Sequence, residues 1–212
     1  MARDTVIDRF RKNAKVRGGA TALYAEVDGE WQTISWSAYW KNCRRFAGAL
    51  ISMGIDVNDA VTIMGNNCPQ WAIADVGTMM ARAVPAGIYQ TSTPEQCAYI
   101  ANHCEARVYV VESAEMWESV APIADELDNV EHYVFIRDID EVDHPKAIGF
   151  EAFLKLGDEH LEAADARIDE IELGDLATLI YTSGTTGPPK GVMLTQKNLS
   201  FTSLEAVKLI GG

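Results

Sequence analysis

Short apolar segments alternate with amphipathic segments of helical periodicity through most of this chain of 212 residues. Between the apolar segments, apolar residues recur at helical spacing. Strands separated by helices of this length require crossover connections, which join parallel strands. We therefore predict an α/β fold with a mostly parallel sheet and flanking helices. The candidate strands are residues 60–64, 84–89, 107–111, 132–136 and 177–181.

Local signals place several helix ends. Helical periodicity runs from Ser37 to Met53, and Gly54 follows as a stop signal. Thr93-Pro-Glu-Gln96 has the form of a capping box and predicts a helix whose apolar face carries Cys97 and Cys104 as core residues. Further helices are expected from about residue 69, over 114–127 and from about residue 196.

A hairpin is predicted ahead of the sheet. The segment Thr21 to Val27 alternates weakly between apolar and polar residues, and Glu30 to Ile34 continues the pattern. Asp28-Gly29 between them is a tight-turn signal. We expect two antiparallel strands here.

The net charge of −13 is concentrated in one part of the chain. Residues 112–172 hold 19 acidic and 4 basic side chains, whereas the remainder is close to neutral. Within this window, residues 138–173 are poorly periodic and predict an acidic connecting segment at the surface, with one short helix over 150–156. A solvated face and an acidic docking surface both fit it. The excess of acid argues against nucleic acid as a partner.

Membrane-spanning and metal-binding signals are missing from the sequence. It contains no run of about 18 apolar residues, and Met1-Ala-Arg-Asp-Thr5 leads into a polar segment without an apolar signal core. The four cysteines form no CxxC pair, and the four histidines show no metal-ligand spacing. We expect a cytoplasmic protein with reduced thiols and no zinc site.

The segment Thr182-Ser-Gly-Thr-Thr-Gly-Pro-Pro-Lys-Gly191 follows the last candidate strand. It combines three glycines, four hydroxyl side chains and Lys190. Glycine lets a backbone wrap closely around an anion, hydroxyls donate to phosphate oxygens, and lysine supplies positive charge. The composition therefore favours polyphosphate binding. It also fits a Gly/Thr-rich turn that joins two strands.

This loop differs from a Walker A loop. In that motif Gly-Lys is followed by Ser or Thr and a helix. Here Gly187 is followed by two prolines, which lack amide donors and prevent an immediate helix. Phosphate binding would therefore depend more on hydroxyls and Lys190 than on a helix dipole.

The segment Tyr181-Thr-Ser-Gly-Thr-Thr-Gly-Pro-Pro-Lys-Gly-Val-Met193 resembles the phosphate-binding signature of the adenylate-forming (AMP-binding) superfamily. Two upstream segments, Trp36 through Gly54 and Pro85 through Gln96, resemble the corresponding parts of long-chain acyl-CoA synthetases. The resemblance covers nearly the whole chain, and its last quarter is the most diagnostic. It implies that residues 1–212 are the N-terminal portion of an AMP-binding domain.

The resemblance implies a long-chain fatty acid–CoA ligase that forms AMP. A fatty acid carboxylate would attack the α-phosphorus of ATP, accompanied by Mg²⁺, and give acyl-adenylate and pyrophosphate. The thiol of CoA, the cosubstrate, would then displace AMP. The residues implied to hold the β- and γ-phosphates are Thr182, Ser183, Gly184, Thr185, Thr186, Gly187 and Lys190. The resemblance also implies that the loop is mobile and that Gly184, Gly187 and Gly191 supply its backbone flexibility.

Later motifs of the superfamily have no counterpart before Gly212. These are the aromatic-Gly-x-Thr-Glu motif, the ribose-binding aspartate, the hinge and the C-terminal domain with its catalytic lysine. We therefore expect a fold that is incomplete at the C-terminus, with a second subdomain only begun near the phosphate loop. We also expect no acyl-AMP formation by the 212 residues alone.

Two other functions remain open from the sequence. The phosphate loop does not report which acid is activated, so adenylation of another carboxylate fits equally well. A non-catalytic binding or interaction module is the alternative from a different class. Peripheral contact with a membrane is compatible with either.

Overall fold

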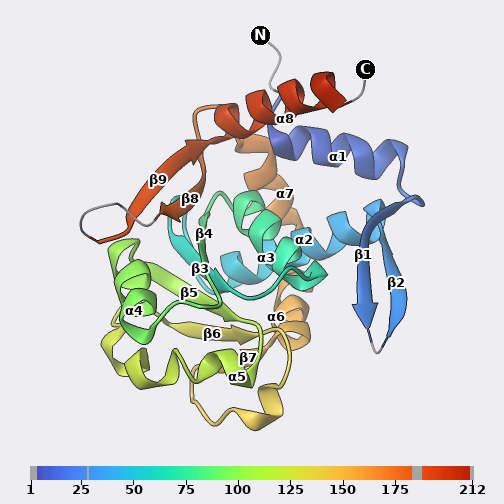
Figure 1. Ribbon diagram of the computed structural model, residues 1–212. Helices are drawn as coiled ribbons and strands as arrows, with labels where there is room; N and C mark the ends of the chain where they lie inside the picture. The colour runs from blue at the N-terminus through green and yellow to red at the C-terminus, as the bar shows by residue number, and fades with distance from the viewer. Residues whose placement is uncertain (1–3, 28, 183–187, 211–212) are drawn as a thin grey trace.

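Most of the chain is organised around one sheet (Figure 1). The computed structural model describes residues 4–27, 29–182 and 188–210, and within them seven strands form this sheet in the order β7-β6-β5-β3-β4-β8-β9. All neighbouring pairs are parallel except β8 and β9, which are antiparallel. The predicted mostly parallel α/β fold is therefore confirmed. The strands are β3 (Ala60–Met64), β4 (Val84–Ile88), β5 (Ala106–Val111), β6 (His132–Phe135), β7 (Ala147–Gly149), β8 (Leu176–Thr182) and β9 (Lys190–Thr195).

Helices cover both faces of the sheet (Figure 1). The core on one face is formed with α2, α3, α6 and α7, with α1 packed against α2 and α3, and the core on the other face with α4, α5 and the 3₁₀ helix η1. The helices are α1 (Val6–Val16), α2 (Trp36–Ser52), α3 (Pro69–Met80), α4 (Pro94–His103), α5 (Ala114–Trp117), α6 (Phe150–Leu156), α7 (Leu161–Glu170) and α8 (Gln196–Ile210). The 3₁₀ helices are η1 (Ala121–Glu126), η2 (Ile139–Glu141) and η3 (Gly157–Glu159).

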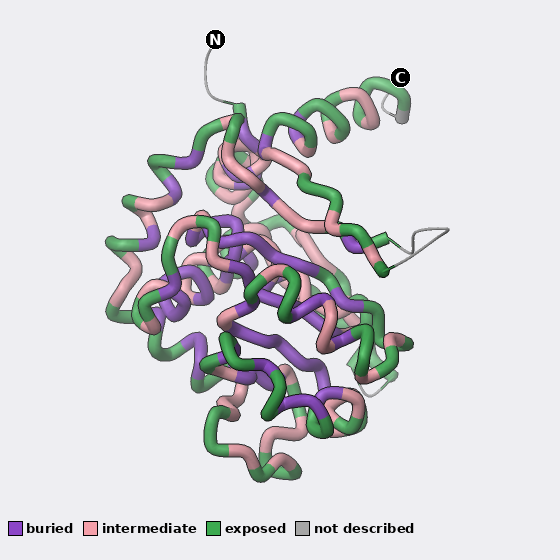
Figure 2. Tube along the Cα trace, turned by 90° about the vertical axis from the view of Figure 1, so that its left-hand side faces the viewer, coloured by how far each residue is buried: buried purple, intermediate pink, exposed green. Residues whose placement is uncertain are grey.

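The central strands alternate between the two cores. In β3, Val61 and Ile63 join the core beneath α2 and α3, whereas Met64 joins the core beneath α4. The same two-residue alternation continues in β5, where Val110 and Tyr109 lie in opposite cores. Burial on both faces explains why these strands read as continuous apolar runs. Figure 2 shows the buried residues, in purple, concentrated in the middle of the molecule.

The N-terminal helix and the C-terminal helix lie side by side at one end of the sheet (Figure 1). Arg9 of α1 donates from Nη1 to the carbonyl oxygen of Ser200 at 2.9 Å. The hydroxyl of Ser200 in turn donates to the carbonyl oxygen of Asp4 at 2.9 Å. These contacts fix α8 against the start of the chain.

The predicted hairpin is confirmed and lies to one side of the main sheet (Figure 1). Its strands are β1 (Thr21–Val27) and β2 (Glu30–Ser35), which pair antiparallel. Gly29 in the turn has φ of +80°, a conformation that glycine adopts without steric penalty. Asp28 lies outside the described residues.

The helix predicted over residues 114–127 is wrong. The chain forms the four-residue helix α5, a turn, and then η1. Pro122 lies in the first turn of η1. It lacks the N–H that a continuous α-helix would need at this position, and its ring would collide with the preceding turn. The proline therefore divides the apolar pattern into two short elements.

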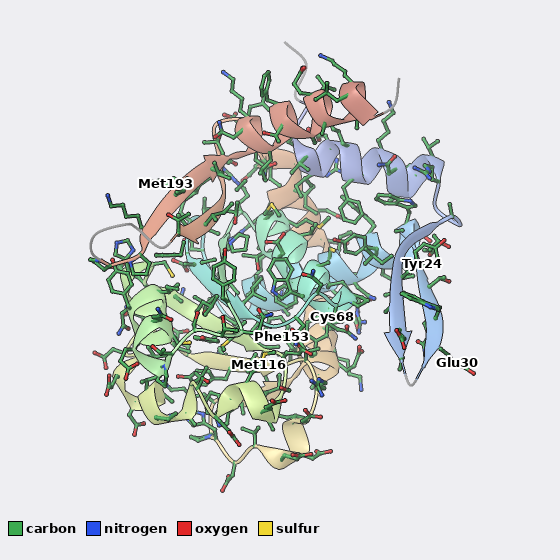
Figure 3. The ribbon with its side chains drawn as sticks, viewed as in Figure 1. Tyr24, Glu30, Cys68, Met116, Phe153 and Met193 are labelled. Carbon is green, nitrogen blue, oxygen red and sulfur yellow. The ribbon has the colours of Figure 1, made fainter. Side chains whose placement is uncertain are left out.

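The helix predicted over residues 150–156 is confirmed as α6, but the interpretation of residues 138–173 as only a surface connection is wrong. Strand β7 extends the sheet, and helices α6 and α7 supply Phe153, Ala164 and Ile168 to the core. Figure 3 shows Phe153 in the interior of the molecule. Most acidic side chains of these helices are exposed, whereas the apolar side chains between them are buried. The high acidic content of the sequence therefore hid the apolar pattern that predicts core helices.

Arginines of the body neutralise part of this acidic segment. Arg45 of α2 pairs with Asp158 at 2.7 Å, and Arg44 of the same helix pairs with Asp165 of α7. Arg11 of α1 pairs with Asp169 at 2.8 Å. The acidic segment is therefore docked on basic residues elsewhere in the chain and is only partly a solvated face.

The expected start of a second subdomain near the phosphate loop is not seen in the described residues. Strand β8 pairs in parallel with β4 through Ala86 and Leu179, and β9 pairs with β8. Both strands that flank the loop therefore belong to the main sheet.

Two glycines allow α2 to touch the segment after α6. A Cβ on Gly157 would lie 1.8 Å from the carbonyl oxygen of Arg45, and one on Gly48 would lie 2.7 Å from the carbonyl oxygen of Gly157. Because these neighbours are backbone atoms, a side chain at either position would push the two elements apart. Backbone contact at this crossing holds the acidic segment against α2.

We predict that Gly157→Ala lowers the free energy of unfolding by about 3 kcal/mol, because the added methyl overpacks a backbone contact. Urea unfolding followed by circular dichroism measures this change. The matched control is Gly174→Ala, since a Cβ on Gly174 has no heavy atom within 4 Å. It should change stability by less than about 1 kcal/mol. Equal effects of the two substitutions would contradict the packing argument.

Candidate functional site

The strand order reverses next to the first strand of the main sheet. Strand β3 leads through α3 on one face to β4, and β4 leads through α4 on the other face back to β5, on the far side of β3. The connections after β3 and β4 therefore leave in opposite directions. In open α/β sheets, ligands bind at such a point, outside the carboxyl ends of the strands.

A cleft of about 890 Å³ lies at this edge of the sheet. Its walls come from the segments that follow β3 and β4, from α3, from the second half of β8 and from Leu199 of α8. Apolar and amide-bearing side chains both line it. The lining residues are Gly65, Asn66, Asn67, Trp71, Asp75, Met79, Gly87, Ile88, Tyr89, Gln90, Thr178, Leu179, Ile180, Tyr181 and Leu199.

A buried carboxylate fixes the rim of the cleft after β3. Glu112, at the end of β5, is 8% exposed and accepts hydrogen bonds from the backbone N–H and the side-chain amide of Asn66. Arg137 pairs with the other oxygen of Glu112 at 3.3 Å. A Cβ on Gly65 would lie 3.2 Å from the Cβ of Glu112. The rim is thus held by carboxylate hydrogen bonds and close packing.

Asp75 of α3 brings a second carboxyl group to the cleft. Burial raises the pKa of Asp75 from 3.8 to about 7. Desolvation disfavours the charged form of a carboxyl group, and here it is the cause of the shift. Asp75 also raises the pKa of the neighbouring Cys43 thiol, after the larger effect of burial.

The structure describes two of the predicted phosphate-binding residues, Thr182 and Lys190. They face each other as the last register pair of β8 and β9 before the loop, and both are exposed. By strand alternation, Thr182 shares a face with Thr178 and Ile180, which line the cleft. A hydroxyl and an ammonium group therefore lie together beside it. The other predicted residues, Ser183, Gly184, Thr185, Thr186 and Gly187, lie outside the described residues.

On the opposite face of the same strand, the side chain of Tyr181 points toward α4. Its side chain is 4% exposed and belongs to the core beneath α4. The Tyr181 hydroxyl lies 2.8 Å from Nδ1 of His103, the last residue of α4. Tyr181 is therefore a packing residue beside the loop.

Cysteine and histidine form no metal centre in the part of the chain that the structure describes, where no group of three or more potential ligands occurs. Cys97 is buried as predicted, whereas Cys104 is only half-buried at the end of α4. Cys68 caps the start of α3, where its sulfur accepts from the N–H of Trp71 (Figure 3). Among the same residues, no helix is both long and apolar enough to cross a membrane.

The cleft residues outside the glycine-rich loop were missed from the sequence. Asn66 follows the strand segment at 60–64 after one glycine, and Gln90 directly follows the segment at 84–89. Polar residues at the carboxyl ends of parallel strands are a usable signal, because these ends meet at one edge. Asp75 and Leu199 lack such a signal, since only folding brings their helices to the cleft.

We predict that Asp75→Asn stabilises the protein at high pH. The folded state holds the Asp75 proton more tightly than the unfolded chain, so the free energy of unfolding of the wild type falls as pH rises from about 4 to about 7. Asparagine does not titrate, so the variant does not lose stability in this way as the pH rises. The variant should exceed the wild type by ~1–3 kcal/mol at pH 8 and show no such gain near pH 4. Urea unfolding at both pH values measures the difference, and a pH-independent difference would contradict the titration of Asp75.

Comparison with known sequences agrees with this architecture. A family model described as AMP-binding enzyme matches residues 10–210. Long-chain-fatty-acid–CoA ligase ACSBG2 of Xenopus laevis is 32% identical over 210 residues, which are 97% of this chain and 28% of that protein. Human ACSBG1, with the same description, is 37% identical over 200 residues, or 94% of this chain and 28% of that protein. The chain thus spans under a third of the length of these curated relatives.

Solved structures share the fold. The anthranilate CoA ligase AuaEII, solved with anthranoyl-AMP, aligns with a TM-score of 0.80 and 22% identity over 96% of this chain and 37% of that chain. A benzoate CoA ligase from Burkholderia xenovorans aligns with a TM-score of 0.72 and 23% identity. The alignment covers 95% of this chain and 36% of that chain. Because the family match extends from residue 10 to residue 210, this chain belongs to the AMP-binding enzyme family.

Proposed function

We propose that this chain forms the ATP phosphate-binding part of an ATP-dependent long-chain fatty acid–CoA ligase. The pairing of Thr182 with Lys190, beside the cleft at the carboxyl edge of the sheet, is the observation that carries the proposal. A hydroxyl donor and a cation at one end of a hairpin suit the oxygens of a polyphosphate. The names of the curated relatives support the fatty acid as the substrate.

Lys190 would act on the charge of the phosphates. As ATP reacts with a carboxylate, negative charge passes to the departing pyrophosphate, and a fixed cation stabilises it. Thr182 would donate its hydroxyl hydrogen to a phosphate oxygen. By the family resemblance, Ser183, Gly184, Thr185, Thr186 and Gly187 would complete the set between them. Mg²⁺ would arrive with ATP, bound to the phosphate oxygens.

The acid and CoA would be bound mainly by groups beyond this chain. The relatives are more than three times as long as the matched region, since that region is 28% of their length. Adenylation of another carboxylate remains the alternative, because the structural neighbours include anthranilate and benzoate CoA ligases. Fatty acid activation is favoured because the sequence identity to the fatty acid ligases is higher, 32–37% against 22–23%.

We predict that Lys190→Ala weakens ATP binding about 10-fold or more, because hydrogen bonds to charged groups contribute roughly 1.5–3 kcal/mol. Isothermal titration calorimetry with Mg·ATP measures the dissociation constant. The matched control is Lys155→Ala, which removes an exposed lysine from α6 and should leave the affinity unchanged. Equal affinities of the Lys190→Ala variant and the wild type would exclude Lys190 from the phosphate site.

We further predict that the 212-residue chain alone catalyses no fatty acid-dependent ATP–pyrophosphate exchange. The chain carries a phosphate-binding segment, whereas most of the length of its relatives lies outside the matched region. Exchange of labelled pyrophosphate in the presence of palmitate and ATP measures acyl-AMP formation, with human ACSBG1 as the positive control. Palmitate-dependent exchange by the purified chain would show that these residues suffice for adenylation.

A further inference from the structure

Tyr181 and its partner Gly191 form the register pair next to Thr182 and Lys190, the two described ends of the proposed phosphate-binding segment. Tyr181 directly precedes Thr182 in β8, and its register partner across the hairpin is Gly191, which directly follows Lys190 in β9. A displacement of Tyr181 would therefore reach Thr182 along the strand and Lys190 through the paired Gly191.

Gly191 rests directly on the Tyr181 ring. A Cβ at position 191 would lie 3.2 Å from Cζ of Tyr181 and 3.4 Å from both Cε1 and the hydroxyl oxygen. The 3.2 Å distance is tighter than most Cβ contacts, so a side chain at position 191 would require the ring or the strand to move by a few tenths of an ångström. The ring thus supports the returning strand as well as the strand that carries it.

His103 holds the hydroxyl end of that ring. Its Nδ1 lies 2.8 Å from the Tyr181 hydroxyl, and the two rings meet edge to face with centroids 5.7 Å apart. His103 is itself stacked on Tyr99, one turn earlier in α4, at 5.3 Å. Helix α4 is fixed at its other end by the Thr93 capping box. The contacts therefore lead from a capped helix through His103 to Tyr181.

We propose that His103 is a positioning residue for the phosphate site. Through its hydrogen bond it fixes the Tyr181 ring, and the ring sets the spacing between the Thr182 hydroxyl and the Lys190 ammonium group. Groups that bind a ligand are most effective when neighbouring packing and hydrogen bonds hold them in place beforehand. This inference rests on the proposed phosphate-binding function.

A purely structural role makes a different prediction. If Tyr181 only fills the core, its hydroxyl is dispensable and phenylalanine replaces it without effect on the ligand. If His103 is only an exposed residue at the end of a helix, leucine replaces it equally well. Under the proposal, both substitutions weaken binding, and they do so through the same hydrogen bond.

The test compares Tyr181→Phe, His103→Leu, their double variant and His103→Asn. Asparagine places an amide group at the position of Nδ1 and can keep the hydrogen bond. Inorganic tripolyphosphate, titrated by calorimetry, is the probe. The matched control is Tyr133→Phe, which removes another buried hydroxyl, bonded to the carbonyl oxygen of Ala124 at 3.2 Å.

Each single variant, Tyr181→Phe or His103→Leu, should weaken binding about 3- to 10-fold, the range of one hydrogen bond. The double variant should be no weaker than Tyr181→Phe, because that change already removes the bond to His103. His103→Asn and Tyr133→Phe should remain within about 2-fold of the wild type. Wild-type affinity of His103→Leu, failure of asparagine to rescue binding, or additive effects in the double variant would overturn the proposal.

A second readout keeps this inference separate from the proposed function. Amide hydrogen exchange at Thr182, Lys190 and Gly191, measured by NMR without ligand, should accelerate in His103→Leu and Tyr181→Phe but not in His103→Asn or Tyr133→Phe. If the wild type binds no tripolyphosphate, the proposed function fails while the exchange rates still decide the role of His103. If the wild type binds but exchange and affinity are unchanged in the variants, only the positioning role fails.

Discussion

Strands β3, β5 and β6 contribute to the cores on both faces, and this requirement limits where a ligand can reach the sheet. Each strand needs a helical layer above and below it, so the crossovers alternate between faces. Helix α3 returns on one face and α4 on the other, which separates the connections at the carboxyl edge. The cleft lies where they separate, and β8 brings Thr182 to the same edge.

Elements that are buried on two sides were predictable from the sequence because local pattern and tertiary role agree. Strand β3 forms over the predicted residues 60–64, and the Thr93 capping box makes both of its hydrogen bonds. Elements with mixed signals were missed. In α7, the apolar residues Leu161, Ala164 and Ile168 stand at helical spacing but are interspersed with four acids. Two of those acids pair with arginines of α1 and α2 in the fold, which the sequence does not show.

The candidate site was predictable only in its contiguous part. A loop of glycines, hydroxyls and one lysine stands in consecutive residues, so Thr182 and Lys190 could be named as candidates from the composition of the segment and from its resemblance to the superfamily signature. Asp75 and Leu199 reach the cleft because α3 and α8 pack beside it, and neither residue differs locally from others of its helix. The raised pKa of Asp75 likewise follows from burial, which the sequence does not contain.

The glycines of the loop motif do not all serve one purpose. From composition, Gly184, Gly187 and Gly191 would equally give the backbone freedom to surround an anion. The structure places a different constraint on Gly191, because a Cβ there would lie 3.2 Å from the ring of Tyr181, which is closer than most such contacts. A Gly191→Ala change would therefore act first on the packing of β9 against Tyr181, and on phosphate binding only through it. The last glycine of the motif thus has a packing role beside Tyr181, in addition to any role in the loop.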